Sequence, residues 1–414
     1  MLRARTARVV RRFALLLAPI LVASACAGTA RAPDAQSPSA AAAPTSANAL
    51  ASDPPTSRPS PTEAQALELF GDLPTDSLDE APAIAFQAAL DAAVASGATD
   101  AIAAVVTAEG TWSGAAGIGG PNGRKATAQD EFAIASVTKT FTAALIMRLA
   151  EQGKIDLDAP LASYLGDLKV DANGASVRQA LGMMAGLADD EQPAAADAIH
   201  VDAAHVWTRE ELVARYLPPE AAPGERFIYS SPTYALLGFA AENVTGTSFP
   251  AAMRAEVLDP VGATRIIAQG PEMKTPQPWA LPIDRNLGVW APEDMGVGGA
   301  ISCISSATYG PGAGSMASDA PSLAAWAWHL FAGDVISESS LRLMTPSPPN
   351  REGFALEEMA GFGGPRAVGH AGNKTGYGTI LVVFPTEQVV VVVLVNNPDF
   401  VVEPTVLALF EAAT

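Results

Sequence analysis

The sequence is poor in cysteine, histidine and basic residues, and each shortage argues against a class of function. It has two cysteines and four histidines among 414 residues. No His-Glu-x-x-His or other metal-ligand spacing occurs, so we expect neither a metal nor another cofactor. Lys and Arg total 25 against 44 Asp and Glu, which gives a net charge of −19. So acidic a chain repels phosphate backbones, and we expect no nucleic-acid partner.

The N-terminus has an apolar run at 13–23 that is too short to span a bilayer comfortably. An arginine-rich segment precedes this run and small residues follow it, which predicts an export signal over residues 1–25. The next residue is Cys26, so the segment resembles a bacterial lipoprotein signal. We therefore expect lipidation of Cys26 at the cell envelope, with this anchor as the only membrane attachment; plain secretion is the alternative.

Residues 26–62 are dominated by Ala, Pro, Ser and Thr and have too few large apolar side chains to form a core. We interpret this segment as a tether between the anchor and a folded domain. The second cysteine is Cys303, which has no disulfide partner once Cys26 is lipidated or removed. Its neighbours include no basic residue, so we expect a small buried side chain rather than a reactive thiol.

The folded domain is expected over residues 78–413. A helical pattern over 78–96 ends at a glycine, and apolar β-branched runs predict strands near both ends of the domain. The fold class is therefore α+β: an antiparallel sheet flanked by N- and C-terminal helices, with a helix-rich inserted subdomain at about 137–295. The expected strands are 101–107, 112–118, 379–384 and 388–395, and the last helix is 403–412.

Ser136 and Lys139 form a Ser-x-x-Lys pattern at the start of an amphipathic helix. A serine hydroxyl needs a base before it becomes a nucleophile, and a lysine one helical turn away supplies one when its pKa is depressed. The helix N-terminus adds N–H donors where an oxyanion would form. No Gly-x-Ser-x-Gly elbow occurs, which argues against an α/β-hydrolase.

Three further segments follow in order: Gln152–Leu165, Ser176–Leu181 and Gly224–Gly238. With the Ser-x-x-Lys pattern they resemble the serine β-lactamase and penicillin-binding protein superfamily. The resembling branch holds class C β-lactamases, D-alanyl-D-alanine carboxypeptidases and related esterases, the peptidase family S12-like members. The resemblance covers roughly residues 80–410 and implies the β-lactamase/transpeptidase-like fold.

The resemblance implies three catalytic residues: Ser136 as nucleophile, with Lys139 and Tyr229 moving protons. The second motif of the superfamily normally reads Tyr-x-Asn, and here Ser231 stands in place of the Asn that contacts the substrate amide. A hydroxyl is shorter and offers one donor instead of two. This departure affects the expected substrate preference more than catalysis.

The third motif is His370-Ala371-Gly372, because Gly376-Tyr377 fills the Gly-aromatic position before the next strand. Lys374-Thr375-Gly376 then lies in the turn and is not the motif. A His in this motif resembles carboxypeptidases and esterases more than class C β-lactamases. By the same resemblance, the N–H of Asn373 is the second oxyanion donor beside that of Ser136.

One more segment, Gly310–Gly314, resembles the superfamily's glycine-rich stretch before a helix, with Ser318 as the expected N-cap. The leading hypothesis is thus an exported serine hydrolase that acts through an acyl-enzyme on a D-alanyl peptide, an ester or a β-lactam. The alternatives are a catalytically silent cell-wall peptide-binding protein of the same fold and a stalk-borne interaction protein. The sequence leaves the oligomeric state open.

Lipidation of Cys26 predicts that the full-length protein, expressed in a bacterium, partitions into the detergent phase. We expect Cys26→Ser to become soluble or to remain uncleaved, because the acceptor thiol is lost. Detergent phase separation followed by intact-mass measurement checks this. Unmodified wild-type protein in the aqueous phase would instead indicate plain secretion.

Overall fold

The main sheet is built from strands near the two ends of the folded domain. The structure, a computed structural model, describes residues 68–189, 198–199, 201–280, 296–346, 353–359, 362, 367–374, 376–397 and 399–414. The export signal, Cys26 and the tether lie outside this part. The strands of the sheet are β1 (Asp100–Thr107), β2 (Gly110–Gly120), β3 (Arg124–Lys125), β7 (Glu357–Glu358), β8 (Val368–Lys374), β9 (Tyr377–Phe384) and β10 (Val389–Val395).

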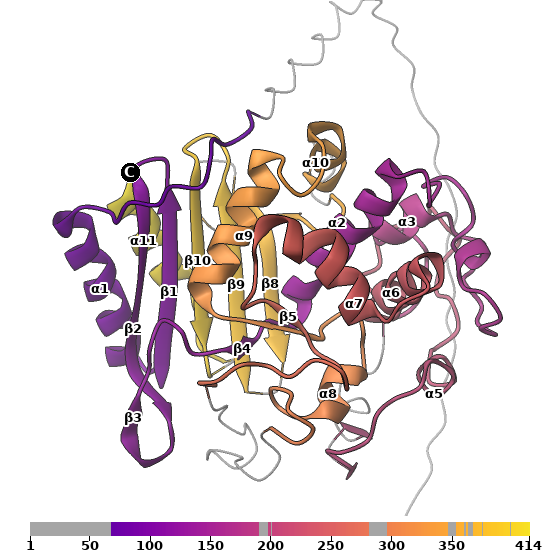
Figure 1. The fold of residues 1–414 in the computed structure, drawn as a ribbon, viewed down its shortest axis with the longest axis horizontal. Helices are drawn as coiled ribbons and strands as arrows, with labels where there is room; N and C mark the ends of the chain where they lie inside the picture. Colours follow the sequence, from indigo (N-terminus) through magenta and orange to yellow (C-terminus); the bar gives the residue numbers. More distant parts are fainter. Residues whose placement is uncertain are drawn as a thin grey trace, which may run out of the picture. The chain divides into compact units, whose positions relative to one another are not determined.

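These strands pair in the order β3-β2-β1-β10-β9-β8-β7, and every pair is antiparallel. Alternate residues face two different cores, as the period of two in a strand requires. In β1 the odd-numbered residues of 101–105 join the core under helices α1 (Glu80–Ala95) and α11 (Glu403–Ala413), the two terminal helices. The even-numbered residues of 102–106 join the second core, which includes helix α9 (Ala320–Ala332). Figure 1 shows these helices against the sheet, which confirms the predicted α+β arrangement.

The other helices gather beside the β8 end of the sheet (Figure 1). Helices α2, α3, α6 and α7 contact one another in this group. A second, three-stranded sheet has the order β4-β6-β5. The bounds of these elements are α2 (Thr138–Glu151), α3 (Val177–Leu181), α5 (Arg209–Val213), α6 (Ser231–Thr245), α7 (Phe249–Met253), α8 (Ile304–Thr308), α10 (Glu338–Met344), β4 (Phe132–Ala133), β5 (Ile267–Ala268) and β6 (Met316–Ser318).

Two local predictions are wrong, and each has a local reason. Ser136 does not lie within α2, because a single 3₁₀ turn, Ala135–Val137, precedes that helix. The N-cap of α9 is Asp319 rather than Ser318; its carboxylate accepts a hydrogen bond from the Ser322 N–H at 2.9 Å. Ser318 instead ends β6, so its backbone belongs to the small sheet.

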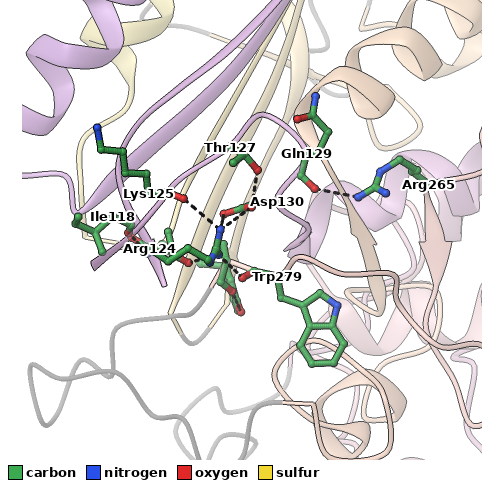
Figure 2. A network of polar contacts seen from close by, with 12 residues as sticks. Ile118, Arg124, Lys125, Thr127, Gln129, Asp130, Arg265 and Trp279 are labelled. Atoms are coloured by element: carbon green, nitrogen blue, oxygen red, sulfur yellow. Dashed lines mark hydrogen bonds and ion pairs between the residues drawn. The ribbon is translucent and has the colours of Figure 1, made fainter. Parts of the chain in front are cut away.

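Two arginines hold the segment that leads into β4, and Figure 2 shows both. Arg124 Nη1 donates to the buried Asp130 carboxylate at 3.0 Å. Its Nη2 donates to the carbonyl oxygen of Trp279 at 2.8 Å. Arg265 Nη2 donates to the carbonyl oxygen of Gln129 at 2.9 Å. The chain is thus fixed by ionic contacts only a few residues before Ser136.

Arg265 also lies between two buried carboxyl groups. Its Nη2 is 2.8 Å from Glu131 Oε1, and its Nε donates to Asp319. One guanidinium serves two acids, so burial and the Asp319 charge raise the pKa of Glu131 to about 9, although the Arg265 charge opposes this. Glu131 is therefore protonated in the folded protein at neutral pH.

The raised pKa of Glu131 predicts that stability falls as pH rises. In the unfolded chain the group titrates near 4.5, so folding takes up a proton between that pH and about 9. This one group should lower the free energy of unfolding by about 1.4 kcal/mol for each pH unit within that window. We expect Glu131→Gln to remove this slope, as measured by urea unfolding between pH 6 and 8.

The control is Glu210→Gln, which changes an exposed carboxylate and should keep the wild-type slope. Equal slopes in wild type and Glu131→Gln would show that Glu131 is ionised in the folded state.

Candidate active site

The strained turn before α2 places Ser136 half-exposed at the surface of the domain. Ala135 has a φ of 48°, in the left-handed region that a non-glycine residue rarely adopts. Such a conformation costs of order 1–3 kcal/mol and persists only where its surroundings fix it. Strand β6 fixes the residues before and after this turn. Ile134 N–H donates to the Met316 carbonyl at 3.0 Å, and Met316 N–H donates to Thr138 Oγ1 at 3.1 Å.

Lys139 is completely buried beneath Ser136. Its Nζ donates to Ser136 Oγ at 3.1 Å and to the carbonyl oxygen of Ala313 at 2.8 Å. A second bond joins the same segments, from Thr142 Oγ1 to the Gly312 carbonyl at 2.7 Å. The predicted glycine-rich stretch therefore lies directly against α2 and supplies an oxygen ligand to the Lys139 amine.

The ring of Tyr229 also lies against this amine. The centre of its ring is 4.9 Å from Lys139 Nζ, a cation–π distance. Its position follows from the start of α6, where Ser230 is the N-cap: Ser230 Oγ accepts from Thr233 N–H at 3.2 Å and donates to the Ala188 carbonyl at 3.0 Å. The structure thus brings the three predicted catalytic residues together around one nitrogen atom.

Ser231 is the first residue of α6 and is half-buried. Its N–H donates to Asp189 Oδ1 at 2.7 Å. No sequence motif marks Asp189 as part of this site. Pairing of residues 42 positions apart gives no periodic signal, so only the fold shows this contact.

The predicted third motif lies on β8, with His370 pointing inward. His370 is 2% exposed, and its ring centre is 6.3 Å from that of Tyr229. Nδ1 is 2.6 Å from the Ala371 carbonyl oxygen, so it carries the proton, and Nε2 is 3.5 Å from Glu357 Oε1. Burial, helped by the Lys139 charge, lowers the pKa of His370 to about 3, so the imidazole is neutral.

Glu357, on β7, is a second acid that the sequence analysis missed. Its side chain is half-buried, and burial raises its pKa while the Lys139 charge acts in the opposite direction. The carboxyl group therefore lies within the field of the same buried amine as His370. Its signal in the sequence is weak because β7 has only two residues.

Gly372 allows β8 to approach the nucleophile. A Cβ at this position would overlap the carbonyl oxygen of Ile134 and press on Ala135, so only glycine fits. The next residue, Asn373, is exposed and pairs with Gly378 of β9. The strand thus passes directly beside the turn that carries Ser136.

Lys374 has a structural role here. Its Nζ donates to the carbonyl oxygens of Ser306 at 2.9 Å and Gly314 at 3.0 Å. Burial lowers the pKa of Lys374 to about 8, although the neighbouring Cys303 acts in the opposite direction. Cys303 itself is 4% exposed, and its Sγ accepts a hydrogen bond from Ser306 N–H at the start of α8. Lys374 therefore holds the glycine-rich segment against β8.

The described residues contain no group of three or more His, Cys, Asp or Glu side chains arranged to hold a metal ion. Within the same ranges, no helix is both long and apolar enough to cross a membrane.

Comparison with known proteins places this geometry in a family. Solved structures with the same fold include a D-stereospecific amidohydrolase from Streptomyces sp., with a TM-score of 0.67 and 26% identity over 79% of this chain and 98% of that one. A D-amino acid amidase from Ochrobactrum anthropi SV3, complexed with L-phenylalanine, has a TM-score of 0.68 and 23% identity over 80% and 98%. Protein flp of Staphylococcus aureus is 28% identical over 148 residues, 34% of this chain but only 28% of that protein.

The profile of the Beta-lactamase family matches residues 86–413, which is most of the described domain. This range includes the Ser136 turn, the start of α6 and strand β8. The family match and the amidohydrolase neighbour support a function of the serine hydrolase type. The chain therefore belongs to the Beta-lactamase family.

Proposed function

We propose that the protein is an exported serine hydrolase that works through an acyl-enzyme on Ser136. The observation that supports this best is the 3.1 Å contact between Lys139 Nζ and Ser136 Oγ, with the centre of the Tyr229 ring 4.9 Å from the same amine. A nucleophile and a base within hydrogen-bond distance, with the base fixed by a third group, are the minimum for covalent catalysis. The proposal of export and of a lipid anchor at Cys26 is supported by the N-terminal sequence alone.

In the proposed reaction, Ser136 Oγ attacks the substrate carbonyl and its proton passes to Lys139, which is an ammonium at rest and acts as the base in its deprotonated form. The carbonyl electrons move to the oxygen, which the N–H groups of Ser136 and Asn373 hold. Collapse of this intermediate expels the leaving group, which takes its proton from Tyr229, and Lys139 returns a proton to the tyrosine. Water then attacks the ester to Ser136 by the same steps in reverse and releases the acid.

A catalytically silent binding protein is the alternative. It would require only the fold and a recognition surface, not a strained serine turn. The left-handed Ala135 and the buried Lys139 amine are both unfavourable on their own; Ala135 directly precedes Ser136, and Lys139 donates to Ser136 Oγ. Both features destabilise the folded protein next to the Ser136 hydroxyl, which favours a catalytic role over binding alone.

The site offers little positive charge for a substrate carboxylate. His370 is buried and neutral, and the amine of Lys374 donates to two carbonyl oxygens. Both penicillins and cephalosporins carry a carboxylate beside the reactive ring. We therefore propose that the acyl donor is an ester or an amide, and neither a β-lactam nor a D-alanyl peptide that ends in a free carboxylate. The amidohydrolase and amidase neighbours support the choice of amide substrates.

If Ser136 is the nucleophile, a fluorophosphonate should add one equivalent to the wild type and none to Ser136→Ala. Lys139→Ala should slow this acylation by roughly 10²–10⁴-fold, the usual effect of losing a general base. Intact mass measures the label, and stopped-flow labelling measures the rate. Thermal unfolding of each variant serves as the control for folding, and full labelling of Ser136→Ala would contradict the mechanism.

Substrate choice should depend on the charge at position 370. We expect the wild type to hydrolyse short p-nitrophenyl esters and to turn over penicillins and cephalosporins poorly. His370→Lys should raise the ratio of β-lactam to ester acylation by about tenfold, the value of one charge-assisted hydrogen bond. Glu357, 3.5 Å from the present imidazole, gives the new ammonium a partner. Efficient cephalosporin turnover by the wild type without esterase activity would mean that the third motif has been misassigned.

A further inference from the structure

A cavity of about 600 Å³ lies at the C-terminal half of α6, and we call it the α6 cavity. Its walls come from α5, α6, α7, α8 and residues 269–272 after β5. Figure 1 shows α5, α6 and α7 on the side of the domain away from α1. The lining residues do not include Ser136, Lys139 or Tyr229, so this cavity is separate from the catalytic site. Its volume is within the range that is usual for small-molecule sites.

Contacts between neighbouring elements fix the walls of the α6 cavity. Arg209 Nη2 of α5 is 2.6 Å from Glu242 Oε2 of α6. The other oxygen of Glu242 accepts the Phe249 N–H of α7 at 2.7 Å. Ser248, the N-cap of α7, donates its hydroxyl to Glu272 Oε2 at 3.0 Å. Each wall is thus bound to the next by the protein itself, so the cavity is formed before any ligand binds.

The walls are largely apolar and include three aromatic side chains. Phe239 and Phe249 belong to the buried core, and the half-buried Trp207 lies beside them in the lining. The indole N–H of Trp207 already donates to Ser305 Oγ at 3.0 Å, so this ring offers a ligand its apolar surface. Val206, at the mouth, is 44% exposed. A ligand with an apolar body would cover this surface, and removing it from water favours binding.

The charged side chains of the lining are one arginine and two glutamates, with a formal sum of −1. The Arg209 guanidinium is matched by Glu242, and it also donates to Asn243 Oδ1 at 2.9 Å. Both oxygens of Glu242 have donors as well, namely Arg209 and the Phe249 N–H. This pair therefore offers a ligand no net charge.

Glu272 carries the charge that remains. It is exposed at the mouth of the cavity, and within the described ranges its only hydrogen-bond donor is the neutral hydroxyl of Ser248. Lys274 is close in sequence, but its aliphatic chain lies against Gly299. A carboxylate at the mouth of an aromatic cavity suits an organic cation, because the carboxylate and the ring faces both attract positive charge.

We propose that the α6 cavity is a second binding site, separate from Ser136, for a small organic cation: a protonated amine on an aromatic body. Glu272 binds the ammonium group, and the rings of Trp207 and Phe239 contact the body. The net charge of −19 attracts such a ligand from solution and disfavours a carboxylate of the same size. This inference is independent of the acyl-enzyme function proposed for Ser136.

The test compares three probes that share one ring and differ in charge: 2-phenylethylamine, which is protonated at neutral pH, 2-phenylethanol and phenylacetate. The readout is the NMR signal of the Trp207 indole N–H, identified by its loss in Trp207→Phe. In the intact protein the amine should shift this signal saturably. It should bind about five- to tenfold more tightly than the alcohol, as expected for one partly exposed ion pair, and phenylacetate should bind most weakly.

Glu272→Gln removes the charge and keeps an acceptor oxygen for the Ser248 hydroxyl. It should lower the affinity for the amine to that for the alcohol and leave the alcohol unaffected. The matched control is Glu109→Gln, since Glu109 is also exposed and accepts a hydroxyl, that of Thr107 at 2.8 Å, but lies outside the cavity. This control should keep the wild-type preference. Sodium chloride at about 1 M should weaken the preference in the wild type, because it screens exposed charges.

Three results would overturn the inference: no saturable shift of the Trp207 signal with the amine, equal or tighter binding of the alcohol or phenylacetate by the wild type, or a preference for the amine that persists in Glu272→Gln. None of these measurements depends on acylation. Failure of fluorophosphonate to label Ser136 would therefore contradict the proposed function and leave the test of the α6 cavity unchanged.

Discussion

The burial of one ammonium group organises the catalytic side of this protein. Lys139 is fully enclosed, and an enclosed ammonium is tolerated only where its protons have acceptors. Ser136 Oγ and the Ala313 carbonyl are two such acceptors, and the face of Tyr229 covers the amine. The next carbonyl along the chain, that of Gly314, accepts from Lys374 on β8. Two lysines from different elements thus hold consecutive peptide groups, and the glycine-rich segment connects the nucleophile helix to the sheet.

Close approach of backbones is the second constraint. Strand β8 passes beside the serine turn only because Gly372 has no side chain, and the turn itself needs the left-handed Ala135. Neither feature could persist in a loosely packed site, because a strained φ relaxes when its neighbours move. Strand β6 and the arginine contacts before β4 supply the rigidity. Geometry at Ser136 therefore depends on residues as distant in sequence as Met316 and Arg265.

Periodicity and motif order were enough to predict much of this arrangement. The apolar, β-branched run at 101–107 predicts a strand, which the structure confirms, whereas the burial of its two faces in two cores is visible only in the fold. The sequence could also distinguish His370-Ala371-Gly372 from the neighbouring Lys-Thr-Gly, because Gly376-Tyr377 had to precede a strand. Asp189 and Glu357 could not be predicted, since each acts through a contact across the fold. The N-cap of α9 was misplaced by one residue because Ser318 and Asp319 are both good capping residues and only β6 decides between them.

Residue type alone does not determine the charge of a catalytic site, and Lys374 and His370 illustrate why. Lys374, the last residue of β8, would supply a cation if its amine faced the substrate, but two carbonyl oxygens bind it. The imidazole would be partly charged in water, but burial and the Lys139 charge keep it neutral. Packing thus neutralises one potential cation and encloses the other. The charge that this site offers to a substrate therefore follows from which side chains the fold encloses, and it disfavours an incoming carboxylate.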